Sequence, residues 1–261
     1  MSDSQRALHE RSGGTGLEDA SPPRLALTDV PSDDAPRGEP ISLRYARMAD
    51  AFEDRRPIDL ALRALDVGLA ALALLIAAPL MALIALALWA TAGRPVLYRG
   101  ERIGRAGASF SIVKFRTLAP DAEQRLGPYL GNELMALTAG ETTPVGRFLR
   151  ETQLDELPQL WCVLTGRMSV VGPRPIRPRF FEQLCAEIPQ YWQRLVVPPG
   201  ITGFAQLRMT REMTWAEKLV HDLEYIADRS VRLYLRVVLA TLCRIARRCV
   251  ASLRPARRAG S

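Results

Sequence analysis

Two acidic residues stand side by side at Asp155 and Glu156, and Arg174 follows them between two prolines. Carboxylates can act as nucleophiles or as acid–base groups, and a guanidinium presents several donors in a fixed fork that matches phosphate oxygens. Two further cations, Lys114 and Arg116, precede the acids in the chain. These residue types predict chemistry on a phosphorylated substrate, with the acids as the reactive groups.

Other catalytic groups are scarce in this chain. It has two histidines, of which His9 lies in a segment whose composition is typical of disorder, and His221 falls on an expected helix. Neither a Ser-His-Asp triad nor a zinc site with histidine ligands is therefore expected. The four cysteines have no paired metal-ligand spacing and no disulfide pattern. Carboxylates must then carry the reaction. Adjacent side chains on a helix point about 100° apart, so Asp155 and Glu156 are expected to divide their roles.

The acids are expected at the start of a helix. Thr152 with Asp155 three residues later resembles a capping signal, and Pro158 is tolerated near a helix start, although it leaves the first helical residue open. A helix N-terminus lowers the pKa of a carboxylate, so Asp155 is expected to be ionised at neutral pH. Gly166 would end the helix. A buried stripe is expected at Leu157, Leu160, Trp161 and Leu164. The alternative is that the acids only complement the helix dipole.

Arg174 follows a short buried strand in the run SVVGPRP. Pro173 and Pro175 stiffen the turn, and Gly172 permits close backbone approach. The arginine is therefore expected to be held at a defined angle, where its guanidinium could match phosphate oxygens. The alternative is a connecting turn in which Arg174 is solvated.

Lys114 and Arg116 are expected on a hairpin. The segments from Val96 to Arg99 and from Phe110 to Phe115 have strand-like patterns, with turn-forming residues between them. Period-two spacing puts both cations on the same strand face, where they could hold a diphosphate. The alternative is that they contact only lipid headgroups.

An uncharged apolar segment runs from Val67 to Gly93, which is roughly 40 Å of helix and long enough to cross a bilayer. Pro79 near its middle should kink it, and arginines flank both ends, so the positive-inside bias favours neither orientation. Both ends facing the cytoplasm would satisfy this bias. An ordinary kinked spanning helix is the alternative.

These patterns divide the chain into four parts. Residues 1–52 are expected to be a disordered tail, 53–93 the membrane segment, 94–250 a catalytic domain and 251–261 a basic tail. From Arg229 to the end there are nine arginines and no acids, typical of an amphipathic helix on a membrane surface or, alternatively, of a solvated helix face. The net charge of +7 suits anionic lipids and phosphorylated substrates, and no nucleic-acid-binding motif is present.

Three ordered motifs carry a resemblance to a known family. They are KFRTL at 114–118, the string LDELPQLWCVLTGRMSVVGPRP around the acids, and PPGITGFAQL at 198–207. Together they resemble the bacterial sugar transferase family of polyprenyl-phosphate phosphoglycosyl transferases. The resemblance covers roughly residues 57 to 245.

The resemblance implies a mechanism. Asp155 would be the nucleophile on the phosphate next to the sugar of a UDP-sugar and a ligand of Mg²⁺, and UMP would leave. A polyprenyl (undecaprenyl) phosphate would then attack the covalent phosphosugar enzyme. Lys114, Arg116 and Arg174 would neutralise phosphate charge.

The resemblance also assigns further positions. It implies a re-entrant helix with a Ser-Pro pair at its bend, where this chain has Ala78 and Pro79. It places Asp222 in the charged network of the site, and Arg150 lies near the acids by chain proximity. The family usually has Trp where Phe204 stands and often a basic residue where Pro198 stands, so substrate contacts in this loop are expected to differ.

The sequence thus predicts a mixed α/β fold: a re-entrant helix-break-helix in the membrane joined to a small, helix-rich catalytic domain. The expected activity is the initiating step of exopolysaccharide, O-antigen or other surface glycan synthesis, on the cytoplasmic face of a bacterial inner membrane. An inactive membrane-attached scaffold with the same fold is the alternative. The donor sugar and the oligomeric state, with a homo-oligomer as one option, are left open.

Overall fold

The computed structural model describes residues 56–119, 140–208 and 213–253, together with Arg47, Ala49, Ala122 and Thr138. The expected disordered tail at 1–52 lies outside the described residues except for Arg47 and Ala49, and the basic tail at 251–261 lies outside them except for the backbone at the end of the last helix.

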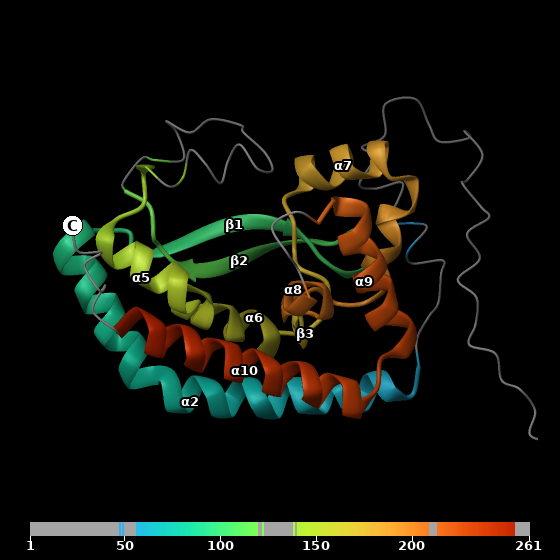
Figure 1. The fold of residues 1–261 in the computed structure, drawn as a ribbon, viewed down its shortest axis with the longest axis horizontal. Helices are drawn as coiled ribbons and strands as arrows, with labels where there is room; N and C mark the ends of the chain where they lie inside the picture. Colours follow the sequence, from blue (N-terminus) through green and yellow to red (C-terminus); the bar gives the residue numbers. More distant parts are fainter. Residues whose placement is uncertain are drawn as a thin grey trace, which may run out of the picture.

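The described part is rich in helix, with four short strands (Figure 1). The first half contains α2 (Ile58–Ala92), β1 (Leu97–Ile103), the 3-10 turn η2 (Arg105–Gly107), β2 (Ser109–Phe115), α5 (Pro144–Thr152), the 3-10 helix η3 (Leu154–Gln159) and α6 (Leu160–Leu164). The second half contains β3 (Ser169–Val171), α7 (Pro178–Glu187), the 3-10 helix η4 (Pro189–Val196), β4 (Gly200–Thr202), α8 (Phe204–Arg208), α9 (Trp215–Asp228) and α10 (Val231–Leu253). The mixed, helix-rich class predicted from the sequence is confirmed.

The strands form two small sheets. β1 and β2 pair antiparallel with Lys114 opposite Tyr98, which confirms the predicted hairpin. β3 and β4 pair in parallel, with Ser169 opposite Gly200. A Cβ atom on Gly172 would lie 2.5 Å from the carbonyl oxygen of Pro198, so the chain can pass this close only with glycine there.

The long apolar segment forms one helix, α2, without interruption at Ala78 or Pro79. The expected helix-break-helix is therefore not present as two separate helices. Pro79 lacks the N–H that would bond to the carbonyl of Leu75, yet the turns on both sides keep helical geometry. Figure 1 shows the ribbon of α2 following the lower edge of the molecule and bending upward toward its C-terminal end.

One face of α2 packs on the rest of the protein along its whole length. Leu62 near its start contacts a cluster with Val171 and Tyr234, and Leu88 near its end contacts a cluster with Phe115 and Leu149. The helix therefore shares hydrophobic cores with the catalytic domain at both ends.

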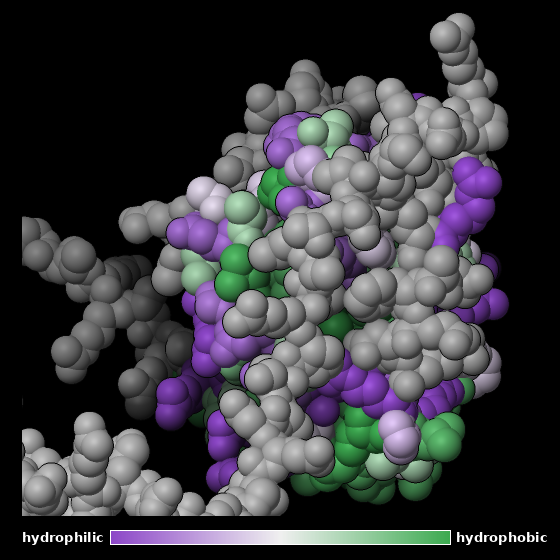
Figure 2. All heavy atoms as spheres, turned by 90° about the vertical axis from the view of Figure 1, so that its right-hand side faces the viewer, coloured by the Kyte–Doolittle hydropathy of each residue, from purple (hydrophilic) through white to green (hydrophobic). Residues whose placement is uncertain are grey.

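The opposite face of α2 is exposed and apolar. Ile76 is 68% exposed and Leu75 is 75% exposed, and Leu239 on the adjacent α10 is 63% exposed. Figure 2 shows the hydrophobic side chains gathered at the lower edge, where α2 and α10 lie in Figure 1. A contiguous apolar surface of this kind marks contact with lipid or protein.

The expected buried stripe is confirmed at Leu160 and wrong at Trp161, which is 60% exposed. α6 buries Leu160 together with Cys162 and Val163, which pack in one core cluster. Tyr191 is 1% exposed, since the 3-10 helix η4, which begins at Pro189, turns it into the core.

Candidate active site

The acid pair lies on η3, between the end of α5 and the start of α6. Thr152 is the last residue of α5, and its hydroxyl donates to the carbonyl of Phe148 at 2.7 Å, so the predicted N-cap at this residue is wrong. Gln153 then adopts a left-handed conformation with φ of 62°, which ends α5 and starts the 3-10 helix. Pro158 lies inside η3.

Glu156 is the centre of an ion-pair cluster. Its Oε1 accepts a hydrogen bond from Lys114 Nζ at 2.6 Å and another from Arg174 Nη2 at 2.9 Å. Burial alone would raise the pKa of Glu156, but the charges and hydrogen bonds of Arg174 and Lys114 outweigh it and lower the pKa to about 2. Three parts of the chain that are distant in sequence thus meet at one carboxylate.

Asp155 has a different environment. Its carboxylate makes no side-chain hydrogen bond or ion pair with the residues that the structure describes. Burial, followed by the charge of Glu156, raises its pKa to about 6, although Lys114, Arg174 and Arg150 each lower it. The expected lowering by a helix N-terminus is wrong, because η3 is a short 3-10 helix and desolvation dominates.

The two acids therefore have different environments, and the division of roles between them stays a prediction. Glu156 is fully ionised at neutral pH and is held by two cations. Asp155 is mostly ionised at pH 7, and its higher pKa makes it a better nucleophile than an ordinary carboxylate. A pair of titratable groups whose pKa values are pushed apart by their surroundings is a mark of a catalytic site.

Lys114 and Arg116 do not act as a pair. The side chain of Lys114 on β2 reaches Glu156, whereas Arg116 lies beyond the last strand residue, Phe115, so the alternation of side chains does not extend to it. The guanidinium of Arg116 donates instead to the carbonyl groups of Ala92 and Gly93. It satisfies carbonyl groups at the end of α2, and its binding of phosphate stays a prediction that no contact supports.

Arg150 is held by two threonines. Its Nε donates to Thr117 Oγ1 at 2.7 Å, and Nη1 contacts Thr142 Oγ1 at 3.3 Å. From there its charge lowers the pKa of Asp155. The prediction that Arg150 lies near the acids is confirmed.

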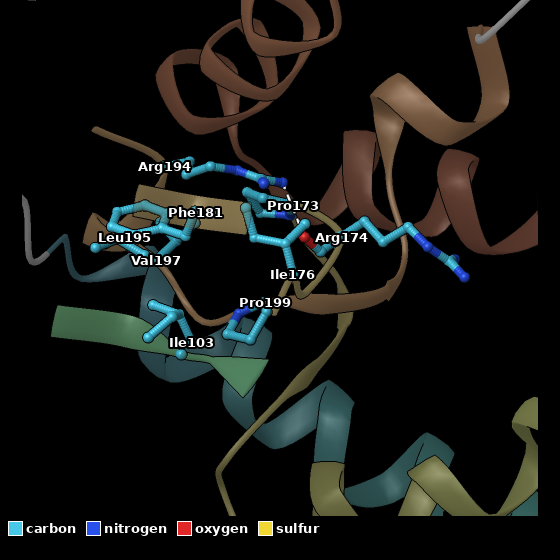
Figure 3. Close-up of a pocket in the computed structure, with 10 residues that line it drawn as sticks. Ile103, Pro173, Arg174, Ile176, Phe181, Arg194, Leu195, Val197 and Pro199 are labelled. Atoms are coloured by element: carbon cyan, nitrogen blue, oxygen red, sulfur yellow. Dashed lines mark hydrogen bonds between the residues drawn. The ribbon is translucent and has the colours of Figure 1, made fainter. Parts of the chain in front are cut away.

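Asp222 contacts Arg194, an arginine that no sequence motif indicated, and in the described structure it makes no contact with the acid pair. It accepts a hydrogen bond from Arg194 Nη2 at 2.7 Å, and both side chains are buried. The same nitrogen of Arg194 donates to the carbonyl of Arg174 at 2.9 Å. Figure 3 shows this contact, with the Arg174 side chain extending away from the apolar pocket beneath Pro173. A buried arginine cannot be distinguished by sequence from the many exposed ones.

The site offers few ligands for a metal. Among the described residues there is no group of three or more His, Cys, Asp or Glu side chains that could hold one. Of the two acids, Asp155 is the one whose carboxylate makes no ion pair with the described residues, so its oxygens are available to a metal ion. One protein carboxylate is compatible with Mg²⁺, which keeps several waters and is commonly bound through substrate phosphates.

Comparison with known proteins was made in two ways. A model of the family described as "Bacterial sugar transferase" matches residues 58–248. A UDP-glucose:undecaprenyl-phosphate glucose-1-phosphate transferase of Caulobacter vibrioides is 37% identical over 226 residues, which is 83% of this chain and 79% of that protein. A protein with the same description from Escherichia coli is 38% identical over 189 residues.

A third relative differs in the sugar that its name gives. It is a UDP-N-acetylgalactosamine-undecaprenyl-phosphate N-acetylgalactosaminephosphotransferase of Aeromonas hydrophila, 33% identical over 183 residues. The matched regions cover 39% of the Escherichia coli protein and 42% of the Aeromonas protein, so this chain spans about two-fifths of their length. Since the family match covers most of the chain and includes the acid pair, this protein belongs to the bacterial sugar transferase family.

Proposed function

We propose that the chain transfers a sugar 1-phosphate from a UDP-sugar to undecaprenyl phosphate, with release of UMP, through a covalent intermediate on Asp155. The protein is a phosphoglycosyl transferase and starts the assembly of a surface glycan, in keeping with the named activities of its relatives. The observation that carries the residue assignment is the divided acid pair. Among the described residues Asp155 has no ion-pair partner and its pKa is raised, whereas Lys114 and Arg174 hold Glu156.

In the first step, an Asp155 carboxylate oxygen attacks the phosphorus next to the sugar. The bond from that phosphorus to the bridging oxygen breaks, and UMP leaves with the electron pair. In the second step, a phosphate oxygen of undecaprenyl phosphate attacks the same phosphorus, which releases Asp155 and forms the lipid diphosphate sugar. An acyl phosphate between the steps divides one difficult transfer into two easier ones.

An anion must approach an anion in both steps, so cations are needed. Lys114 and Arg174 lie beside the acids and can neutralise phosphate oxygens, and Arg150 adds positive charge near Asp155. Asp155 would be the protein ligand of Mg²⁺, and the metal would supply positive charge for the phosphoryl transfer. An inactive scaffold would have no need to keep Asp155 buried at a cost in stability.

The reaction is tested by UMP release from purified protein in lipid nanodiscs, with undecaprenyl phosphate and a panel of UDP-sugars. We expect one or a few UDP-sugars to give UMP. Chelation of divalent cations with EDTA should reduce the rate by at least about 100-fold, and added Mg²⁺ should restore it. No UMP from any UDP-sugar in the presence of Mg²⁺ would contradict the activity, and full activity in EDTA would contradict the metal requirement.

We also propose that α2 lies in the cytoplasmic leaflet of a bacterial inner membrane as one bent helix, with both of its ends on the cytoplasmic side. A straight helix of 35 residues is roughly 52 Å long, well beyond the ~30 Å hydrocarbon core. Yet Leu62 and Leu88, near its two ends, both pack on the same catalytic domain. A helix that crossed the bilayer would carry one of these ends away from that domain.

The topology is tested with single cysteines at Ser42 and Gly93, in a protein without its four native cysteines, and a membrane-impermeant thiol reagent on intact cells. Both positions should stay protected. In Pro79→Leu, which restores the missing backbone N–H and should favour a straight helix, the Ser42 side should become reactive. Reactivity near Ser42 with Pro79 intact would show an ordinary spanning helix and would leave the catalytic assignment untouched.

A further inference from the structure

Asp66 is a buried acid on the membrane helix, and the proposed mechanism does not use it. It lies in the third turn of α2, is 4% exposed, and directly precedes the uncharged part of the helix. One of its oxygens, Oδ1, accepts three hydrogen bonds. The donors are the hydroxyl of Ser169 at 2.9 Å, the backbone N–H of Val170 at 2.7 Å and the hydroxyl of Tyr234 at 2.7 Å.

These contacts fix the strand that leads to Arg174. Ser169 and Val170 are the first two residues of β3, and the turn with Arg174 begins directly after this strand. β3 is also held on its other edge, where it pairs with β4. Asp66 therefore fixes the chain to α2 only a few residues before Arg174.

Arg63, one helical turn before Asp66, holds the element on the other side of the site. Its Nη1 donates to the carbonyl of Val163 at 2.6 Å, and its Nη2 donates to the carbonyl of Leu164 at 2.9 Å. These carbonyls end α6, the helix that continues directly from the 3-10 helix with the acid pair. Residues three apart on a helix lie on the same face, so Arg63 and Asp66 contact the two elements from one side.

We infer that Arg63 and Asp66 are positioning residues that set the separation between the acid pair and Arg174. Arg63 fixes the element that carries the acid pair, Asp66 fixes the strand that leads to Arg174, and the ion pair of Arg174 with Glu156 joins the two directly. Burying a carboxylate is costly, and an apolar side chain often gives equal or greater stability at such a position. Asp66 instead contributes to geometry, because the three hydrogen bonds that its Oδ1 accepts fix the position of the first residues of β3.

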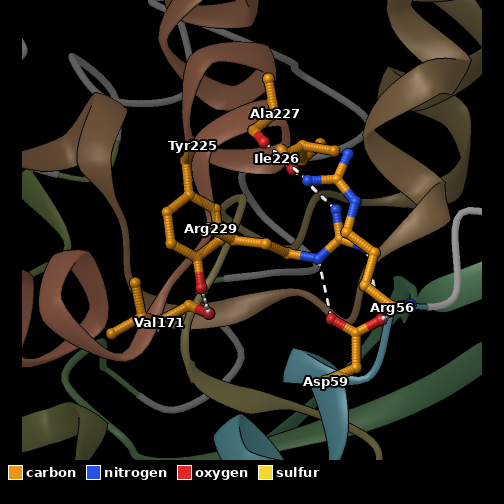
Figure 4. A network of polar contacts seen from close by, with 7 residues as sticks. All are labelled: Arg56, Asp59, Val171, Tyr225, Ile226, Ala227 and Arg229. Carbon is orange, nitrogen blue, oxygen red and sulfur yellow. Dashed lines mark hydrogen bonds and ion pairs between the residues drawn. The ribbon is translucent and has the colours of Figure 1, made fainter. Parts of the chain in front are cut away.

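Asp59, on the same helix, provides a matched control. It pairs with Arg229 Nε at 2.8 Å, at the junction of α9 and α10, and Figure 4 shows this contact beside the hydrogen bond from Tyr225 to Val171. Asp59 thus ties α2 to the helices and contacts neither α6 nor the start of β3 in the described structure. A general loosening of α2 should follow from changes at either acid, but displacement of Arg174 should follow only from Asp66.

The kinetic test, which rests on the proposed function, is a double-mutant cycle of Asp66→Leu with Arg174→Lys in nanodiscs, read as kcat/KM for UMP release. Alone, Asp66→Leu should lower kcat/KM by about 30-fold, and in the Arg174→Lys protein by less than about 3-fold, because the residue through which it acts is already impaired. Asp66→Asn keeps an acceptor oxygen and should recover most of the activity. If the fold-losses of kcat/KM from Asp66→Leu and Arg174→Lys simply multiply in the double variant, the two residues act independently and the inference is wrong. For the control Asp59→Leu, the fold-loss of kcat/KM should be the same in the original protein and in the Arg174→Lys protein.

A second measurement does not depend on activity. Spin labels are placed at the exposed positions Trp161 on α6 and Arg179 on α7, in a background without native cysteines. They report the distance between α6, which continues from the helix with the acid pair, and α7, which follows the turn with Arg174. The distance distribution should broaden in Asp66→Leu and in the milder Ser169→Ala, and should stay narrow in Asp66→Asn and Asp59→Leu. An unchanged distribution in Asp66→Leu and Ser169→Ala would overturn the inference even if the enzyme proves inactive on every UDP-sugar.

Discussion

Replacing Asp155 with Asn should abolish turnover, with a fall in kcat of at least about 10³-fold, because an amide cannot replace the carboxylate as nucleophile. The substitution keeps the size and shape of the side chain. The rate of UMP release at saturating UDP-sugar and undecaprenyl phosphate measures the effect. A variant that turns over at more than about one-tenth of the original rate would show that another group carries the phosphosugar.

The stability of the same variant separates a chemical defect from a folding defect. The pKa of Asp155 is raised to about 6, so its charged form is disfavoured in the folded protein. At pH 7.5 and without divalent cations, Asp155→Asn should therefore be more stable by up to about 3 kcal/mol. As the pH falls below 6 the wild-type carboxyl gains its proton in the folded state, and the difference should shrink. Thermal unfolding at pH 7.5 and at pH 4.5 measures both points.

Glu156→Gln should also be severe, for a different reason. The neutral amide keeps one acceptor oxygen but removes the charge that Lys114 and Arg174 both contact. Breaking a buried ion pair typically costs about 3–5 kcal/mol, since the partner is left uncompensated. We expect a loss of kcat/KM of about 10²-fold and a fall in the unfolding temperature at pH 7.5. Glu151→Gln, at an exposed position on α5, is the control and should change neither quantity.

The pH dependence of stability tests the same assignment. The pKa of Glu156 is lowered to about 2, so its contribution is present above the unfolded-state pKa near 4.5 and is lost as the pH falls toward 2. The stability difference between the original protein and Glu156→Gln should therefore be constant above pH 5 and should decrease in acid. A difference that grows as the pH falls would contradict the ion-pair cluster.

Much of the site could be predicted because its residues are close in sequence or punctuated by special residues. Asp155 and Glu156 are neighbours, and Arg174 lies between prolines whose turn depends on Gly172. The apolar composition of α2 and the hairpin with Lys114 also follow from local patterns. Each of these features is indicated by residues that are close to one another in the sequence.

The remaining features depend on contacts between distant segments. Burial and the charge of Glu156 raise the pKa of Asp155 more than three cations from other elements lower it, so the local helix-dipole argument gave the wrong direction. Arg116 caps α2 across more than twenty residues, and Arg194 joins Asp222 to the turn with Arg174. Asp66 did carry a signal, because an ionisable residue beside an apolar membrane segment is commonly functional. Asp66 stands one residue before Val67, the first residue of the expected apolar segment, and the sequence alone does not show which groups surround it.

The most direct test of the account is a single-turnover experiment without acceptor. Protein is mixed with Mg²⁺ and the active UDP-sugar, labelled in both the sugar and the uridine, and is then denatured and separated. We predict UMP release close to one equivalent per active protein and sugar label retained on the peptide with Asp155, which later undecaprenyl phosphate removes. UMP release only when acceptor is present, with no sugar label on the protein, would contradict the covalent mechanism.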